Sequence, residues 1–78
     1  MPDQNQSNDL YENKDLEHEA ISEREAEILD QLSCGASNKT IADSLNITIH
    51  TVEKHLTNIY KKLKVRSRIE AALRWAKR

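Results

Sequence analysis

The segment from Ser37 to Leu63 constrains the fold more than any other part of this chain, because it predicts two helices joined by a very short connection. Each helix is preceded by a hydroxyl residue that can cap it, Ser37 before the first and Thr48 before the second. Each also repeats apolar residues three and four positions apart, which is the spacing of one buried helix face. These residues are Ile41, Ala42 and Leu45, followed by Val52, Leu56, Ile59, Tyr60 and Leu63. The connection is only about three residues long and contains Asn46, which tolerates the left-handed conformation that ends a helix, so a helix–turn–helix unit is expected.

Two further helices flank this unit in the sequence. Ser22 and Glu25 have the spacing of a capping box, in which each side chain accepts a hydrogen bond from the backbone N–H of the other residue. The helix that they open is expected to end at Gly35. Its apolar stripe consists of Ala26, Ile28, Leu29 and Leu32.

Ser67 and Glu70 predict a second capping box and a fourth helix that runs to about residue 77. The side chains expected to face the core from this helix are Ile69, Ala72, Leu73 and Ala76. One Gly and one Pro in the whole chain argue against a strand-rich fold, which needs more turn residues. The sequence therefore predicts an all-α fold, a four-helix helix–turn–helix domain over residues 21–78.

Residues 1–20 form an acidic leader that differs from the rest in charge. Residues 1–21 carry six acids and one base, whereas residues 54–78 carry nine bases and one acid. The overall net charge of −1 therefore conceals a basic C-terminal half. The leader has few apolar residues, so we expect it to be flexible, although a short helix over residues 10–20 is an alternative.

Several classes of function are excluded or disfavoured. A chain of 78 residues forms one domain and leaves no room for the separate lobes of an enzyme. Cys34 is the only Cys, and we expect it to be a small core residue rather than part of a disulfide or zinc site. The histidines (His18, His50 and His55) lack partners at ligand spacing, so we expect no enzyme activity, no cofactor and no metal. No apolar run reaches the roughly 20 residues of a membrane span and no secretory signal is present, so a cytoplasmic protein with no membrane partner is the default expectation.

The polar face of the third helix, over about residues 49–63, carries side chains suited to DNA. With the apolar stripe buried, the outward residues are His50, Thr51, Glu53, Lys54, Thr57, Asn58 and Lys61. Thr51, Lys54 and Lys61 carry a hydroxyl or a cationic group that can contact phosphates. Glu53, Thr57 and Asn58 can contact base edges. The alternative is a merely solvated face, but the positive charge from Lys54 onward favours DNA. His55 lies beside the buried stripe, and both packing and phosphate contact remain open for it.

Two interpretations of Trp75, the only Trp, also remain open. The ring can pack in the core, or it can contact a second copy of the chain together with Ala71 and Ala72, whose small side chains let two helices approach closely. A single recognition helix contacts only a few base pairs. A weak homodimer that binds a two-fold DNA site is therefore expected.

Residues 21–76 resemble the C-terminal helix–turn–helix domain of the LuxR-type bacterial transcription regulators, also called the NarL/FixJ group. The matching stretches are ISEREAEIL (21–29), GASNKTIA (35–42), Ile47 with Thr48, TVEKH (51–55), Asn58 with Ile59, KLKV (62–65), and Arg68 with Ala71. The resemblance implies a four-helix domain whose partner is double-stranded DNA, with the third helix in the major groove and the fourth helix forming a dimer.

The resemblance also implies roles for individual residues. Glu53, Lys54 and Thr57 match base-facing positions, and the positions near phosphate are matched by Asn38, Lys39, Thr51, His55 and Lys61. Thr48 and His50, at the start of the same helix, complete the expected DNA-binding set. The expected dimer interface consists of Arg68, Ala71, Ala72 and Trp75. Many family members carry basic residues where Glu53 and Thr57 stand, so their sequence preference is not carried over.

Most such domains follow a regulatory domain, so this chain is expected to be either a stand-alone member or a fragment of a longer regulator. RNA polymerase and a larger LuxR-type regulator are further candidate partners. The alternative function is a protein-interaction module that pairs with such a regulator through the fourth helix and modulates it. Glu53 mildly favours this alternative, because an acid at a groove-facing position repels phosphate.

Overall fold

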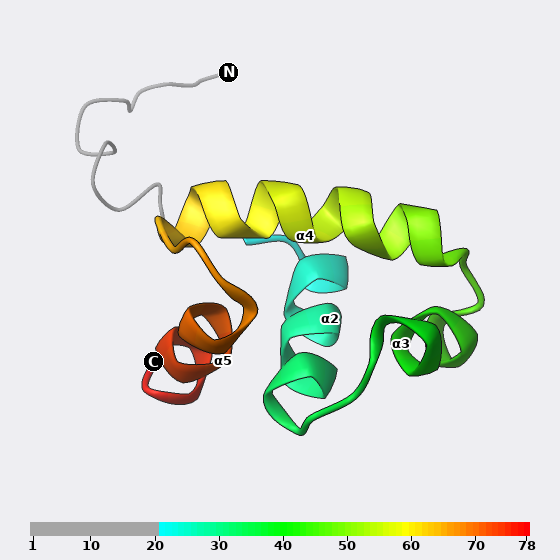
Figure 1. Cartoon of the computed structure of the whole chain (residues 1–78), viewed down its shortest axis with the longest axis horizontal. Helices are drawn as coiled ribbons and strands as arrows, with labels where there is room; N and C mark the ends of the chain where they lie inside the picture. The colour runs from blue at the N-terminus through cyan, green and yellow to red at the C-terminus, as the bar shows by residue number, and fades with distance from the viewer. Residues whose placement is uncertain (1–20) are drawn as a thin grey trace, which may run out of the picture.

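The computed structural model describes residues 21–78, which fold into four helices with no strand (Figure 1). The helices are α2 (Glu23–Ser33), α3 (Asn38–Leu45), α4 (Ile49–Leu63) and α5 (Arg68–Ala76). The predicted all-α, four-helix fold is confirmed. The acidic leader of residues 1–20, and the short helix considered within it, lie outside the described residues.

Each helix begins at the predicted capping residue. The side chains of Ser22, Ser37, Thr48 and Ser67 each accept a hydrogen bond from the backbone N–H three residues later. The capping box of α2 is complete, because the Glu25 carboxylate also accepts the Ser22 N–H at 3.0 Å. The second predicted box is only half formed. The Glu70 carboxylate accepts the N–H of Arg66 at 2.6 Å instead of that of Ser67, one residue earlier than the pattern requires.

Three residues near helix ends have a positive φ, and two of them are of a type that adopts such angles readily. Gly35 has a φ of +90° and Asn46 a φ of +61°, and both residue types adopt such angles at low cost. Lys64 ends α4 with a φ of +60°, which the sequence did not predict. Cys34 is the residue that ends α2, and its side chain is exposed, so its expected place in the core was wrong. The reason is that α2 stops at Ser33, so Cys34 is its cap and lies two positions beyond Leu32, the last buried residue of the helix.

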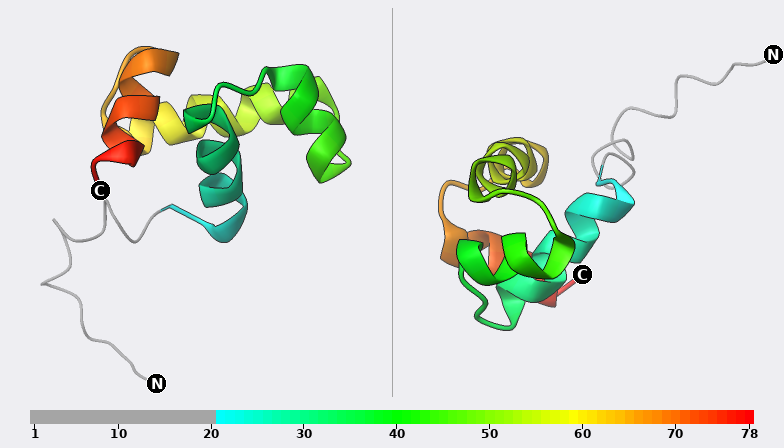
Figure 2. Two further views of the ribbon diagram at one scale, coloured as in Figure 1. Left: turned by 90° about the horizontal axis from the view of Figure 1, so that it is seen from below. Right: turned by 90° about the vertical axis from the view of Figure 1, so that its right-hand side faces the viewer.

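The four helices are arranged around α2. In Figure 1, α4 lies across the top, with α2 beneath its middle and with α3 and α5 at opposite ends, and the views in Figure 2 agree. Helix α2 packs mainly against α5, and α3 packs mainly against α4. The largest fully buried side chains come from α2, α3 and α4 and are Ile28, Leu29, Ile41, Val52 and Ile59. The predicted apolar stripes of these three helices are therefore confirmed at their centres.

The predicted core face of α5 was wrong at three of its four residues, the exception being Ala72. Ile69 and Leu73 are 72% and 55% exposed, and Ala76 is also exposed. Ala71 is instead completely buried, with Arg68, Ala72 and Trp75 half-buried beside it. Helix α5 has apolar residues on two sides, so periodicity alone could not select between them. The small side chain of Ala71 allows α5 to pack close to α2, which is the helix it contacts most.

Glu25 is the buried charged residue among residues 21–78, at 4% exposure. Its carboxylate accepts a hydrogen bond from the ammonium of Lys62 at 2.7 Å, which joins the start of α2 to the end of α4. Burial alone would raise the pKa of Glu25. Hydrogen bonds from Lys62 and Ser22, together with the positive charge of Lys62, outweigh burial and lower that pKa. The pair therefore holds α2 to α4 as an ionised carboxylate and ammonium.

Candidate nucleic-acid interface

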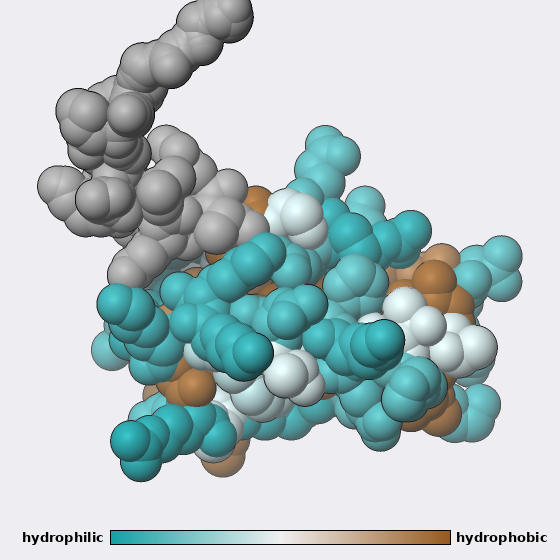
Figure 3. Space-filling view, turned by 90° about the horizontal axis from the view of Figure 1, so that it is seen from above, coloured by the Kyte–Doolittle hydropathy of each residue, from teal (hydrophilic) through white to brown (hydrophobic). Residues whose placement is uncertain are grey.

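The α3–α4 unit presents one long polar face. The connection between α3 and α4 is only residues 46–48, and the backbone N–H of Ile47 bonds to the Ala42 carbonyl at 2.9 Å, which fixes the turn. Figure 3 looks onto the face that carries α4. That face is mostly hydrophilic, and apolar surface shows at its right-hand end, where α3 joins α4.

The polar residues predicted to face outward on α4 are exposed on this face, with one exception, Thr51. The exposed set is His50, Glu53, Lys54, Thr57, Asn58 and Lys61. Thr51 and His55 are half-buried, so Thr51 points outward less than predicted. For His55 the partial burial is compatible with both of its proposed roles.

Three of these side chains are held by local hydrogen bonds. The hydroxyls of Thr48 and Thr51 lie 3.0 Å apart at the start of α4. The Thr57 hydroxyl donates to the carbonyl of Glu53 one turn earlier, at 3.1 Å. His50 Nδ1 lies 4.0 Å from the Glu53 carboxylate, with both side chains largely exposed. Glu53 therefore presents acceptor oxygens to solvent, with a nearby imidazole on one side.

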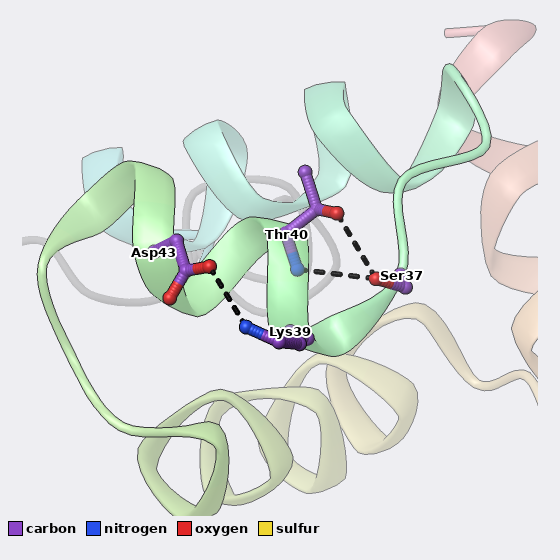
Figure 4. Close-up of polar contacts among 4 residues, drawn as sticks. All are labelled: Ser37, Lys39, Thr40 and Asp43. Atoms are coloured by element: carbon purple, nitrogen blue, oxygen red, sulfur yellow. Dashed lines mark hydrogen bonds and ion pairs between the residues drawn. The ribbon is translucent and has the colours of Figure 1, made fainter.

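The predicted phosphate-contact residues on α3 have different environments. Figure 4 shows Lys39 paired with Asp43 on the same helix, at 3.3 Å between Nζ and Oδ2. Both side chains are more than 70% exposed, so this pair contributes at most about 1 kcal/mol, and the Lys39 ammonium can exchange its partner for a phosphate. The Asn38 amide oxygen accepts a hydrogen bond from Arg68 at 2.8 Å. Asn38 is thus also part of the α3–α5 contact.

Most of the residues predicted for a dimer interface instead make contacts within one copy of the chain. Arg68 donates to the Ala36 carbonyl as well as to Asn38, both at 2.8 Å, and so ties α5 to the start of α3. Ala71 has no exposed surface. The Trp75 indole N–H donates to Asp30 of α2 at 2.8 Å, and the Arg78 guanidinium lies 4.1 Å above the ring. Packing within one copy, the first of the two interpretations of Trp75, therefore accounts for the buried part of its ring. Ala72 is also half-buried against the core.

Three apolar residues at the surface were missed as site candidates. Ile69 and Leu73 lie one turn apart on α5 with their side chains exposed. Ile49, the first residue of α4, is 43% exposed. The sequence holds no decisive sign of any of them, because each belongs to an apolar pattern that also fits a core.

Neither metal binding nor membrane crossing gains support from the described residues. Within residues 21–78, no group of three or more His, Cys, Asp or Glu side chains is placed to hold a metal ion. In the same range, no helix combines the length and apolarity needed to cross a bilayer.

Comparison with known proteins agrees with this geometry. Residues 19–75 match the family model described as bacterial regulatory proteins, luxR family. Among curated proteins, the transcriptional regulatory protein LiaR of Bacillus subtilis is 48% identical over 58 residues, covering 74% of this chain and 28% of LiaR. The nitrate/nitrite response regulator protein NarP of Escherichia coli is 47% identical over 53 residues, covering 68% of this chain and 25% of NarP. The chain thus spans less than a third of the length of these relatives.

Proposed function

Because this chain belongs to the luxR family of bacterial regulatory proteins, we propose that it is a sequence-specific DNA-binding transcription regulator. The relatives named above are regulators of transcription or of a nitrate/nitrite response, and the same role is proposed for this domain. Membership of a family of regulatory proteins confirms the expectation that the chain is not an enzyme.

The observation that carries the proposal is the exposed polar face of α4. The short turn after α3 presents the first half of α4 outward, where His50, Glu53 and Lys54 are exposed, and Thr57 is exposed just beyond the midpoint of the helix. An α-helix presented in this way fits the major groove, where its N-terminal residues contact base edges. We propose that Lys54, Lys61 and Lys39 contact phosphates, while Glu53, Thr57 and Asn58 contact bases.

We propose that two copies bind a two-fold site through α5. The contact is assigned to Ile69 and Leu73 rather than to Ala71, because the first two are exposed and one helical turn apart. Exposed apolar pairs of this kind are stabilised when a second copy covers them. The area is small, so the dimer is expected to be weak without DNA and stronger on it.

The first experiment is selection of bound duplexes from a randomised DNA pool at two salt concentrations. Enrichment of an inverted repeat would support a dimeric, sequence-specific protein, and its half-site spacing would report the distance between the two α4 helices. Binding that is weak, salt-sensitive and without a motif would contradict sequence-specific regulation.

The dimer is tested separately with the double variant Ile69→Ser, Leu73→Ser. We expect it to keep its helix content by circular dichroism and to lose self-association by analytical ultracentrifugation. It should then bind a single half-site as the unchanged chain does, but a full inverted repeat less tightly. Unchanged binding to the full repeat would show that α5 does not form the dimer contact.

The same exposed pair on α5 also suits the alternative function, in which the chain pairs with a larger LuxR-type regulator. That function needs no DNA contact by α4. Loss of regulator binding in the α5 double variant, together with no binding to any duplex by the unchanged chain, would favour it over the leading proposal.

A further inference from the structure

Ile49 is an exposed apolar residue that neither the core nor the proposed dimer explains. It is absent from the buried cluster and from the half-buried residues that pack against that cluster. The other large exposed apolar side chains in residues 21–78, Ile69 and Leu73, lie on α5. Figure 1 shows α5 and the start of α4 at opposite ends of the molecule. Ile49 therefore belongs to a different surface from the α5 pair.

A single exposed Ile is common on protein surfaces, so its position must supply the argument. Ile49 is the first residue of α4, and Glu53 follows it by four positions, so the two side chains are neighbours on the helix surface. Thr57 follows Glu53 by four positions again. Together, Ile49, Glu53 and Thr57 form a row that begins at the end of α4 expected to enter the groove most deeply.

The second observation concerns the Thr57 hydroxyl. Its proton is donated to the Glu53 carbonyl at 3.1 Å, so it is not available to donate to a base. What Thr57 can offer outward is its methyl group and an acceptor lone pair. The row therefore consists of an acceptor-only carboxylate with an apolar group about one helical turn away on either side.

Major-groove chemistry indicates which base edges suit such a row. Thymine alone presents a methyl group there, at C5, and cytosine presents an amino donor to a carboxylate. Resting on the proposed function, we infer that Ile49 and Thr57 recognise thymine methyl groups on either side of the base contacted by Glu53. This chain would then recognise its half-site largely through apolar contacts and a carboxylate.

Replacing thymine by deoxyuridine tests this inference, because it removes only the C5 methyl group. We would measure the affinity of the full chain by fluorescence anisotropy for the selected operator and for duplexes with one thymine replaced at a time. Each contacted methyl should contribute about a fourfold change in affinity. Two positions in each half-site are expected to show this loss, while uncontacted thymines show none.

Matched variants assign each position to a side chain. Ile49→Ala should abolish the thymine-to-deoxyuridine difference at one position and leave the other unchanged. Thr57→Ser, which deletes the methyl, should abolish it at the second position, whereas Thr57→Val, which keeps the methyl, should retain it. Thr40→Ser is the control, because it deletes an exposed methyl group on α3, outside the row on α4, and should leave both differences unchanged.

The outcomes separate this inference from the proposed function. Sequence-specific binding with no deoxyuridine effect, or with an effect that Ile49→Ala leaves intact, would overturn the inference and leave the proposed function standing. A selected half-site without thymine would do the same. Failure of the unchanged chain to bind any duplex would refute the proposed function and the inference together.

Discussion

Removing the Lys62 ammonium should destabilise the domain more than its position near the surface suggests. In Lys62→Met, the Glu25 carboxylate stays 4% exposed but loses its 2.7 Å partner, while it keeps the hydrogen bond from Ser22. Removing one member of a fully buried pair costs about 3–5 kcal/mol. The Lys62 side chain is 31% exposed and the Ser22 bond remains, so we expect a loss of about 2 kcal/mol in the free energy of unfolding.

Such a loss corresponds to a fall of roughly 8–16 °C in Tm for a domain of this size. Urea denaturation at about neutral pH, followed by circular dichroism at the helix band, measures the free energy directly. The control is Lys61→Met, which removes the same charge from the neighbouring exposed position and should change stability by less than about 0.5 kcal/mol.

The pH dependence gives a second test of the same reasoning. In the unchanged domain the pKa of Glu25 is lowered, so its ionisation contributes stability at neutral pH that is lost as the pH falls through that pKa. In Lys62→Met the burial that raises the pKa persists without the ammonium. That variant should therefore lose less stability on acidification, and its deficit should shrink between neutral pH and about pH 4.

Adding Glu25→Gln to Lys62→Met should recover most of the lost stability, because the amide oxygen can still accept the Ser22 N–H without a buried charge. The reasoning is refuted if Lys62→Met is as stable as Lys61→Met. It is also refuted if neither acidification nor Glu25→Gln reduces the deficit.

Three further predictions follow from single contacts. Arg68→Met should lower the free energy of unfolding by about 1–2 kcal/mol in urea denaturation, because it leaves two oxygen acceptors near the start of α3 without their donor; an unchanged midpoint would argue that water replaces both bonds. Gly35→Ala should cost about 1 kcal/mol through its φ of +90° alone, since nothing lies within 4 Å of the added Cβ, and Gly35→Asn should cost less in the same assay. Lys54→Ala should weaken binding to all duplexes and reduce the slope of log affinity against log salt by about one, whereas an unchanged slope would remove Lys54 from the phosphate contacts.

The helix boundaries were predictable because they depend on interactions within one turn. Caps such as Ser37 and Thr48 act on N–H groups three residues away, and the left-handed Asn46 ends α3 through its own backbone preference. The left-handed Lys64 was not predictable in this way, since Lys has no such preference. Its conformation accompanies the hydrogen bond from the Val65 N–H to the Tyr60 carbonyl at 3.0 Å.

The candidate site was predictable where a single face was available. On α4 the apolar stripe is unique, so the polar residues opposite it are exposed as expected, apart from the half-buried Thr51. Ile49 was missed because it precedes the first buried residue of α4, Val52, and is 43% exposed instead of packing with the core cluster. On α5 the two apolar sides compete, and only contacts with residues more than thirty positions away select between them. The bond between Arg68 and Ala36 is one such contact, and that between Trp75 and Asp30 is another.

The choice of face on α5 also connects the fold to the proposed function. The inward side of α5 is fixed at two places, by Arg68 to the start of α3 and by Trp75 to α2. Its outward side carries Ile69 and Leu73, the proposed contact between copies. Because α3 packs mainly against α4, a dimer formed through α5 would set the spacing of two α4 helices through this chain of internal contacts. Removing the hydrogen bonds of Arg68 should therefore broaden the range of half-site spacings to which the dimer binds, even where each half-site is still bound.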